Sequence, residues 1–322
     1  MSRLVRRRYT KDSSLAYFVN QLQNLDRTLH EPLVAVSWGR DIKLRPGLTM
    51  SNESSSFIRN SFAAPGTLQN TTGNMPWVSA ETSAIPGVSV NGQMLTSPLR
   101  LLAREISYTS VELERSQLTG QPIDVQKLSA MNTLYQMNID QMVYIGSSDV
   151  GATGLVNSAD VTAGFVADGI SGSKLWSQKT ADEILADVNT LLDATWTASA
   201  VAVCPRNLRL PPTQFSYIAS QKVSSAGNVS ILEFLKQNSI ALAANGVPLD
   251  IQPVKWLTGR GVDSTNRMVA YTNELDYVRF PMVPIRRETA YYQGIRFAAP
   301  YIYAFGEMEF VYPETVRYAD GI

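Results

Sequence analysis

Ser171 and Lys174 come closest, among the residues of this 322-residue chain, to a catalytic motif. Their S-x-x-K spacing is that of penicillin-recognising enzymes, in which the serine is the nucleophile. In this sequence the pair lies in a Gly/Ser-rich loop rather than at the start of a helix. The Lys179-Thr180 pair that follows lacks the glycine that the same enzymes carry after it. A chance match explains these residues better than catalysis does, and a cytoplasmic serine-type enzyme that uses Ser171/Lys174 is kept as an alternative hypothesis.

Other residues that commonly support catalysis or metal binding are scarce. The chain has one histidine, His30, and one cysteine, Cys204, so it cannot build a Cys/His zinc site or an intramolecular disulfide. Asp149, Asp160 and Asp168 lie in a loop-rich stretch but lack the alternating spacing of a calcium-binding loop. No glycine-rich phosphate-binding motif occurs. We therefore predict no catalytic residue, no metal and no cofactor, and we expect that the protein is not an enzyme.

Charge is sparse and balanced along the chain. Charged residues make up 17% of the sequence, against about 25% in an average soluble domain. Lysine plus arginine number 28 and aspartate plus glutamate number 28, so the basic excess of a nucleic-acid-binding protein is absent. The low charge predicts that a partner covers part of the surface. No stretch is apolar and long enough for a membrane span, so we expect no membrane association.

The one concentration of charge is a basic cluster near the N-terminus, formed by Arg3, Arg6, Arg7 and Arg8. Arginines bind phosphate groups whatever the base sequence, so these residues are candidates to face DNA. A solvated terminus, or ion pairs with a neighbouring subunit, explains the cluster equally well. A short amphipathic helix is expected after the cluster, over residues 14–29.

Residues 51–100 differ in composition from the rest of the chain. Small, polar and turn-forming residues dominate, and turn signals such as Pro65-Gly66 and Asn91-Gly92 separate short apolar pieces. A disordered linker is the alternative, but a solvated linker does not carry this much apolar surface. We predict an extended β-arm that packs on another molecule. The residues expected to contact a neighbouring subunit are Phe57, Phe62, Trp77 and Val88.

The remaining sequence predicts the elements that position this arm. Two capping boxes, Thr180 with Glu183 and Ser230 with Glu233, each indicate the start of a helix. The other expected elements are a strand over 99–118, helices over 123–145 and 180–196, a buried strand over 201–204, a helix from Pro211-Pro212, strands near 248–255 and 268–272, and aromatic strands with a bulge at Gly306. Helices and strands are interspersed, so we predict an α+β fold.

Four stretches in the C-terminal half resemble a widespread branch of phage capsid proteins. These are Lys179–Asn189, Leu210–Ile218, Ile231–Lys236 and Arg317–Ile322. The order of a basic arm, a β-arm, a long strand, a long helix, a compact α/β part and returning strands resembles the Hong Kong 97-type shell fold of tailed-phage major capsid proteins. The resemblance implies an N-terminal arm, an extended β-hairpin called the E-loop, a peripheral (P) domain with a long spine helix, and an axial (A) domain.

The resemblance assigns a segment of the chain to each part of that fold. The implied boundaries are 1–50 for the N-terminal arm, 51–98 for the E-loop, 99–146 for the P-domain strand and spine helix, 147–274 for the A-domain and 275–322 for the returning P-domain strands. The implied function is that of a structural protein of the virion. Pentamers and hexamers of it would form an icosahedral phage head around double-stranded DNA, assembled in the host cytoplasm with a portal.

Two features depart from some proteins with that fold. Residues 1–50 are all that precede the β-arm, so a separate scaffolding protein is expected. Residues 51–100 contain no lysine, so this arm cannot supply a lysine for a cross-link to a neighbour. The nearest alternative is an encapsulin, a bacterial protein-filled shell of the same fold. Co-purified cargo protein in place of DNA would favour that alternative.

Overall fold

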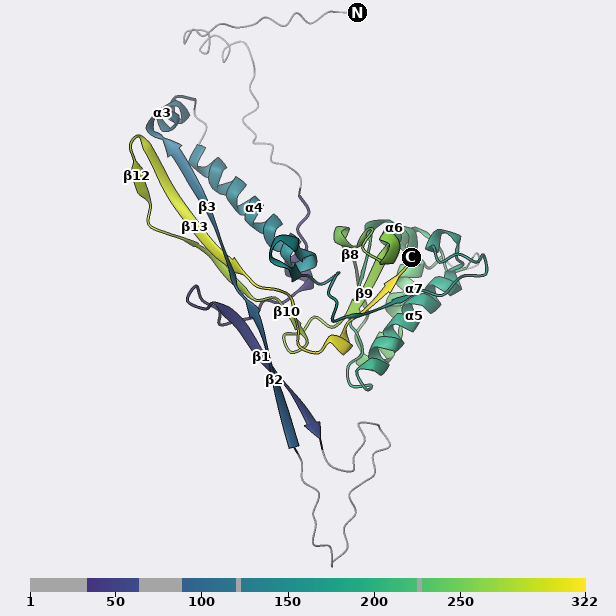
Figure 1. The fold of residues 1–322 in the computed structure, drawn as a ribbon. Helices are drawn as coiled ribbons and strands as arrows, with labels where there is room; N and C mark the ends of the chain where they lie inside the picture. The colour runs from purple at the N-terminus through teal and green to yellow at the C-terminus, as the bar shows by residue number, and fades with distance from the viewer. Residues whose placement is uncertain (1–33, 64–88, 120–122, 225–227) are drawn as a thin grey trace, which may run out of the picture. The chain divides into compact units, whose positions relative to one another are not determined.

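The computed structural model describes residues 34–63, 89–119, 123–224 and 228–322 (Figure 1). Residues 1–35 and residues 36–322 form two separate units. The helix expected over 14–29, the basic cluster, Trp77 and Val88 lie outside the described residues. The N-terminal arm was expected to extend to residue 50, but Ile42 is buried in the core of the second unit, so the body begins near residue 36.

A long β-hairpin occupies part of the region predicted to form a β-arm. Its strands β1 (Ser54–Ala63) and β2 (Ser89–Pro98) pair antiparallel in an unbroken register, from Ser54 opposite Pro98 to Ala63 opposite Ser89. Within the described residues, each of these strands pairs with no strand but the other (Figure 1). A two-stranded hairpin is marginally stable in water unless it packs on something else.

The hairpin leads into a four-stranded antiparallel sheet that carries the longest helix. Strand β3 (Arg100–Thr109) pairs along its whole length with β13 (Arg296–Phe305). The other two strands are β11 (Met282–Arg287) and β12 (Tyr291–Gln293). Helix α4 (Ile123–Tyr144) runs beside β3 and β13 in Figure 1, and the Tyr135 ring lies 5.0 Å from that of Tyr303. The helix expected over 123–145 is present.

The strand expected over 99–118 is shorter than predicted. It ends at Thr109, and helix α3 (Ser110–Thr119) follows directly. The Thr109 backbone N–H donates to the Glu112 carboxylate, and the Glu112 N–H donates to the Thr109 hydroxyl. This reciprocal pair is a capping box, which starts a helix and so ends the strand. The same hydrogen bond from Thr109 lowers the pKa of Glu112.

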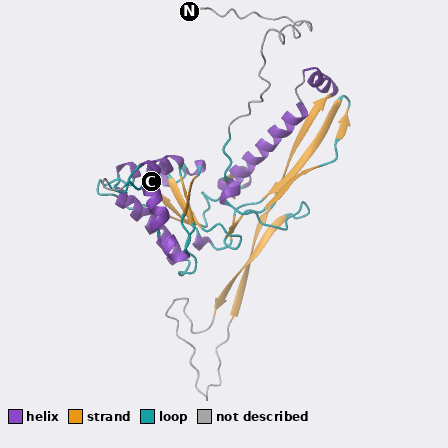
Figure 2. Cartoon of the chain, turned by 180° about the vertical axis from the view of Figure 1, so that it is seen from behind, coloured by secondary structure: helices purple, strands orange, loops and turns teal. Residues whose placement is uncertain are grey.

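A five-stranded sheet and four helices form the compact α/β part (Figure 2). The strand order is β6 (Thr162–Phe165), β15 (Arg317–Asp320), β9 (Arg267–Tyr271), β7 (Asn207–Leu210) and β8 (Asp250–Pro253). The helices are α5 (Ala181–Ala198), α6 (Pro212–Ser220), α7 (Ile231–Asn238) and α8 (Ile240–Asn245). One apolar core, which includes Val188, Leu192 and Leu208, fills the space between them.

Local sequence explains where the helices of this part begin. The Thr180 hydroxyl accepts from the Glu183 N–H, and the Glu183 carboxylate accepts from the Thr180 N–H at 2.7 Å, so the predicted capping box is confirmed. Ser230 caps α7 by accepting from the Glu233 N–H, so one half of the second predicted capping box is present. The helices expected from Thr180, from Pro211-Pro212 and from Ser230 are present.

Three expectations about strands are wrong. Residues 201–204 do not form a strand: they follow a turn at residues 199–201, in which Ala200 and Val201 have φ of 53° and 64°, and the strand is β7, a few residues later. The Ser199 hydroxyl holds this turn by accepting from the Val203 N–H and donating to the Val203 carbonyl. No bulge lies at Gly306, because β13 ends before it, and the register shift is in β11 instead.

The last residues of the chain were expected to return to the sheet that contains β3, and this third expectation is also wrong. Strand β15 pairs with β6 and β9 of the compact part, so the last residues do not return to the sheet that contains β3. Arg267 of β9 makes a two-pronged ion pair with Asp320 of β15, at 2.7 and 2.8 Å, and both side chains are buried. This pair joins the C-terminus to the compact part.

The remaining elements of the described chain are short. They are α2 (Trp38–Asp41), β4 (Gly146–Ser147), β5 (Ala152–Thr153), β10 (Val278–Arg279), β14 (Glu309–Phe310) and the 3₁₀ turns Ser148–Val150, Trp176–Gln178, Lys255–Leu257, Val262–Ser264 and Pro313–Thr315. Gly146 has φ of +76°, and a Cβ there would lie 2.1 Å from the Ala152 carbonyl oxygen. Only glycine fits where α4 turns into β4.

Candidate assembly surfaces

The base of the β1–β2 hairpin is fixed to the body by a buried carboxylate. Glu309 of β14 pairs with Arg45 at 3.0 Å and with Arg279 at 2.7 Å, and it also accepts a hydrogen bond from the Ser55 hydroxyl of β1. Arg45 in turn donates to the Ser56 carbonyl at 2.8 Å. A buried carboxylate that accepts from two guanidinium groups and a hydroxyl is strongly held, because a buried charge is stable only when it is paired and hydrogen-bonded.

A second set of contacts fixes the next residues of β1. Arg59 donates to the carbonyls of Phe310 and Val311, and the Arg279 guanidinium lies 5.5 Å from the Phe57 ring centroid. Phe57, which was expected to contact a neighbouring subunit, is half-buried against its own chain. Phe57 and Arg59 point to the hairpin face that meets β14. The side chain of Phe62 lies outside the described residues.

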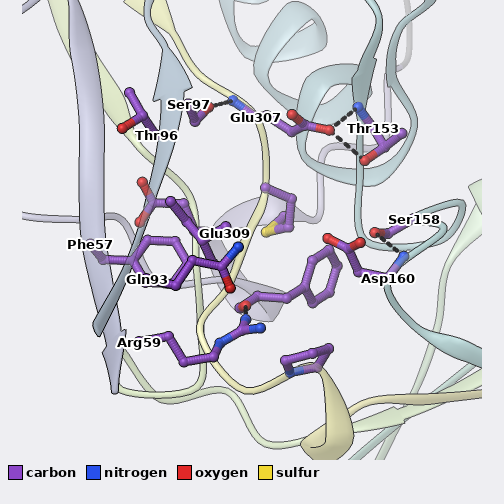
Figure 3. Close-up of a pocket in the computed structure, with 14 residues that line it drawn as sticks. Phe57, Arg59, Gln93, Thr96, Ser97, Thr153, Ser158, Asp160, Glu307 and Glu309 are labelled. Carbon is purple, nitrogen blue, oxygen red and sulfur yellow. Dashed lines mark hydrogen bonds between the residues drawn. The ribbon is translucent and has the colours of Figure 1, made fainter. Parts of the chain in front are cut away.

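A cavity of about 400 Å³ lies where the hairpin meets the body (Figure 3). Phe57, Arg59 and Gln93 line it from the hairpin, and Glu307 and Asp160 line it from the body. Glu307 is held by the N–H of Thr153 at 2.9 Å and by its hydroxyl at 2.7 Å. The cavity therefore has polar walls whose charged groups are largely held within the chain.

The opposite face of the hairpin exposes three apolar side chains that no described residue covers. Ile58 and Met94 lie directly opposite each other in the register, and they are 65% and 67% exposed. Val90 points to the same face and is 60% exposed. Alternation along a strand sends every second side chain to the other face, so these three residues point away from the face that carries Phe57 and Arg59. A contiguous exposed apolar face of this kind marks an interaction surface.

Three residues of α4 hold the segment that follows the N-terminal unit. Gln136, Asp140 and Tyr144 are spaced four residues apart and therefore share one helix face. The Trp38 indole donates to Gln136 at 2.9 Å, the N–H groups of Ser37 and Trp38 donate to Asp140, and the Ser37 hydroxyl lies 3.0 Å from the Tyr144 hydroxyl. We call residues 37–41 the root segment, because residues 1–35 precede it.

The root segment also connects α4 to the compact part. Asp41 is fully buried and accepts from Arg209 of β7 at 2.9 Å and from the Tyr144 hydroxyl. Arg209 is almost completely buried and also pairs with Asp250 at 2.7 Å. Burial alone would raise the pKa of Asp250, but Arg209 lowers it below the usual value. The buried guanidinium therefore joins three segments that are distant in the sequence.

The compact part exposes apolar side chains in its loops. Ile170 is 92% exposed at the tip of a turn that is closed by the Gly169 N–H, which donates to the Ser173 carbonyl, and by the Ile170 N–H, which donates to Glu183. Phe165 and Leu175 are also exposed. These side chains add to the apolar surface that the single chain leaves uncovered.

The structure does not assemble the chemistry considered from the sequence. The Ser171 hydroxyl donates to the Gln178 carbonyl, and Lys174 lies 3.7 Å from Asp168. Asp149 and Asp160 do not join Asp168 in a cluster, since the described residues contain no group of three acidic, histidine or cysteine side chains suited to a metal. Burial raises the pKa of the Cys204 thiol, which makes it a poor nucleophile.

Sequence reasoning missed the contacts that fix the hairpin and the root segment. Arg45, Glu309 and Arg209 are isolated charged residues in the sequence, and no spacing links them. Asp140 and Gln136 are four residues apart on a predicted helix, which was a usable signal for a shared polar face. Ile58 and Met94 were among the apolar residues of the β-arm, but only the register shows that they share a face.

Comparison with known proteins adds an independent result. Residues 73–322 match the model of a family described as Major capsid protein. No curated protein matches the chain in sequence. No helix in the described part of the chain has the length and hydropathy needed to cross a membrane.

Solved structures of similar fold cover nearly the whole chain. The capsid of Myoviridae phage XM1 has a TM-score of 0.74 at 14% identity, covering 94% of this chain and 97% of that chain. The capsid of an empty GTA particle has a TM-score of 0.60 at 12% identity, covering 97% and 99%. A chain of Mycobacterium phage Ogopogo has a TM-score of 0.55 at 12% identity, with the same coverage. The predicted α+β fold and the resemblance to phage capsid proteins are confirmed.

Proposed function

This chain belongs to the major capsid protein family, and from that premise we propose that it builds an icosahedral phage head from pentamers and hexamers around double-stranded DNA. The observation that carries the proposal is the uncovered apolar face of the β1–β2 hairpin, formed by Ile58, Val90 and Met94. Nothing in the described part of the chain covers this face. A second copy of the chain is the partner that a shell subunit always has beside it.

Each part of the structure has a role in this proposal. The β1–β2 hairpin is the E-loop and lies across a neighbouring subunit. The sheet of β3, β11, β12 and β13 with helix α4 is the P-domain, in which α4 is the spine helix. The five-stranded sheet with α5–α8 is the A-domain, which meets its copies around the five- and six-fold axes.

The rigid base of the hairpin supports this role. An arm that joins subunits must leave the body in a fixed direction, and the Glu309 ion pairs with Arg45 and Arg279 hold it there. Each apolar side chain that a neighbour covers contributes on the order of 1–3 kcal/mol. Summed over the many copies of a shell, such contacts hold particles together without covalent links.

The partners follow from the same proposal. The basic cluster of Arg3, Arg6, Arg7 and Arg8 faces the enclosed DNA, while Phe62, Trp77 and Val88 extend the apolar contact of the hairpin to the neighbour. A portal and a separate scaffolding protein take part in assembly, which occurs in the host cytoplasm. The role is structural, so no catalytic residue is assigned.

Electron microscopy of the purified protein tests the proposal directly. We expect closed particles with icosahedral symmetry, and in particles from infected cells we expect DNA of genome length inside. A preparation that stays monomeric under all assembly conditions contradicts a shell function. Closed particles filled with a second protein in place of DNA support the encapsulin alternative instead.

A further inference from the structure

One face of the four-stranded sheet carries arginines whose guanidinium groups make no ion pair or hydrogen bond within the described residues. The register places Arg104 of β3 opposite Tyr301 of β13, and Tyr301 opposite Arg287 of β11. Directly opposed residues on antiparallel strands point to the same face. These three side chains therefore form a row across three strands. Tyr303, two residues after Tyr301, packs on Tyr135 of α4, so the row is on the α4 side of the sheet.

Both arginines of this row are exposed and unpaired. Within the described residues, neither guanidinium makes a hydrogen bond or an ion pair. Arg100 lies four residues before Arg104, so it points to the same face of β3, and it is exposed and unpaired as well. Exposed arginines without carboxylate partners are available to bind an external anion.

The opposite face of the same sheet shows what paired arginines look like. Arg296 lies 2.5 Å from Glu105 and also donates to the Ser107 hydroxyl. Arg286 lies 2.5 Å from Glu288. Arg286 and Arg296 on the opposite face are therefore paired with carboxylates. Within the described residues, Arg104 and Arg287 on the α4 side are not.

The strands that carry the row add no competing negative charge to it. Strands β3, β11 and β13 contain one acidic residue, Glu105, and it points to the opposite face. Glu112 of α3 is paired with Lys127 of α4 at 3.4 Å, so its charge is compensated. Asp140 of α4 is fully buried and held by the root segment. The unpaired arginines thus create a local positive potential.

We propose that the row of Arg104, Tyr301 and Arg287, extended by Arg100, contacts phosphate groups of the enclosed double-stranded DNA. The α4 side of the sheet then faces the shell interior, an inference that rests on the proposed function. Neighbouring strands are about 4.8 Å apart, which separates the two arginines of the row by roughly 10 Å. A duplex presents one negative charge per about 1.7 Å of axis, so both guanidinium groups reach phosphates of one duplex.

Two double variants with the same change in charge test the proposal. R104Q/R287Q removes the unpaired arginines, and R286Q/R296Q removes the paired ones from the opposite face. Binding of the purified full-length protein, before assembly, to a short fluorescent DNA duplex is measured across a range of salt concentrations. We expect the slope of log affinity against log salt to become shallower by about 2 for R104Q/R287Q, because two phosphate contacts are lost. The slope for R286Q/R296Q is expected to be unchanged.

Further outcomes separate the alternatives. R104K/R287K keeps both charges and should keep the slope. Equal slopes for the two glutamine variants overturn the proposal. Normal DNA binding by R104Q/R287Q together with loss of closed particles overturns it too, since the row then contacts another subunit. If the double variant does not fold, R104Q and R287Q alone should each lower the slope by about 1. Particle formation by the unaltered protein is measured separately. A failure of the proposed shell function can therefore be distinguished from a failure of the arginine row to contact DNA.

Discussion

The compact α/β part and the β1–β2 hairpin use apolar residues in opposite ways. In the compact part, Val188 and Leu192 of α5 point into the core, where both are completely buried. In the hairpin, Ile58 and Met94 remain about two-thirds exposed, although the strands that carry them are fully paired. Within the described residues each hairpin strand pairs along one edge only, whereas β15, β9 and β7 of the compact part pair along both edges, so only the compact part surrounds its strands with further structure.

This contrast shows which region is complete within one chain. The compact part has strands paired across a five-stranded sheet and helices over them, so its stability comes from contacts within the subunit. The hairpin has one face fixed to the body through Glu309 and Arg59 and one face that no described residue covers. The first region should therefore respond to mutation through stability, and the second through assembly.

Removing the far part of the hairpin should have the largest effect on assembly. Residues 61–91 are replaced by Asn-Gly, which closes a tight turn at the pair Asn60 and Gly92. We expect a folded subunit that no longer forms closed particles, since the joint between subunits is lost. Sedimentation measures particle formation, and circular dichroism checks the fold. Full-size particles in normal yield would show that the hairpin is not the joint.

Breaking the buried ion pair between the two parts should have the largest effect on stability. Arg209→Ala leaves Asp41 buried with fewer partners, and we expect a loss of about 3–5 kcal/mol in the free energy of unfolding. Urea denaturation measures this loss. Arg206→Ala is the matched control, because Arg206 pairs with Glu274 at an exposed site and should cost less than about 1 kcal/mol. Equal losses for the two variants would contradict the role given to burial.

A matched pair of apolar truncations tests the contrast itself. Leu191→Ala opens a cavity in the core of the compact part and should cost about 2–5 kcal/mol. Ile58→Ala changes an exposed residue, so stability should change by no more than about 0.5 kcal/mol. Only Ile58→Ala should lower the yield of closed particles among the subunits that fold. If Ile58→Ala destabilises the subunit as much as Leu191→Ala, the hairpin face is covered within the subunit and the contrast fails.

The smallest expected effect is at the start of α5. Thr180→Ala removes the helix cap and should cost about 1 kcal/mol. Hydrogen bonds from the N–H groups of Thr180 and Ile170 lower the pKa of Glu183. The stability that this carboxylate supplies is therefore present above its ordinary pKa and is lost as the pH falls through its lowered value. Unfolding measured from neutral to acidic pH should show this loss, and Glu183→Gln should lack it. An unchanged acid dependence in Glu183→Gln would contradict this account.

Local rules were sufficient for α4 and α5 but missed α3, which replaces the end of the strand expected over 99–118. The capping box of Thr180 with Glu183 and the apolar spacing of residues 184–192 act over a few residues, and they placed α5 correctly. The spacing over 123–145 likewise placed α4. The sequence also indicated that residues 51–98 hold β-structure with more apolar side chains than a linker needs. These features depend on hydrogen bonds and periodicity that the chain carries locally.

Strands were placed less well, because a strand depends on a partner elsewhere in the chain. Residues 201–204 have the composition of a buried strand, but the chain enters them through a turn that the Ser199 hydroxyl holds. Residues 317–320 were assigned to the wrong sheet, since only β6 and β9 on either side decide where β15 pairs. The Glu112 cap that ends β3 was local but competed with a strand pattern that continued past it.

The sequence by itself determined helices α4–α7, the apolar β-arm, the lack of a Cys/His metal site and the resemblance to a family of shell proteins. Only the tertiary structure decided which faces are free. Register places Ile58 with Met94 on one face and Arg104 with Arg287 on another, and it pairs Arg296 with Glu105. A side chain is free or paired according to groups that are distant in the sequence, and the local rules that form helices contain no information about those groups.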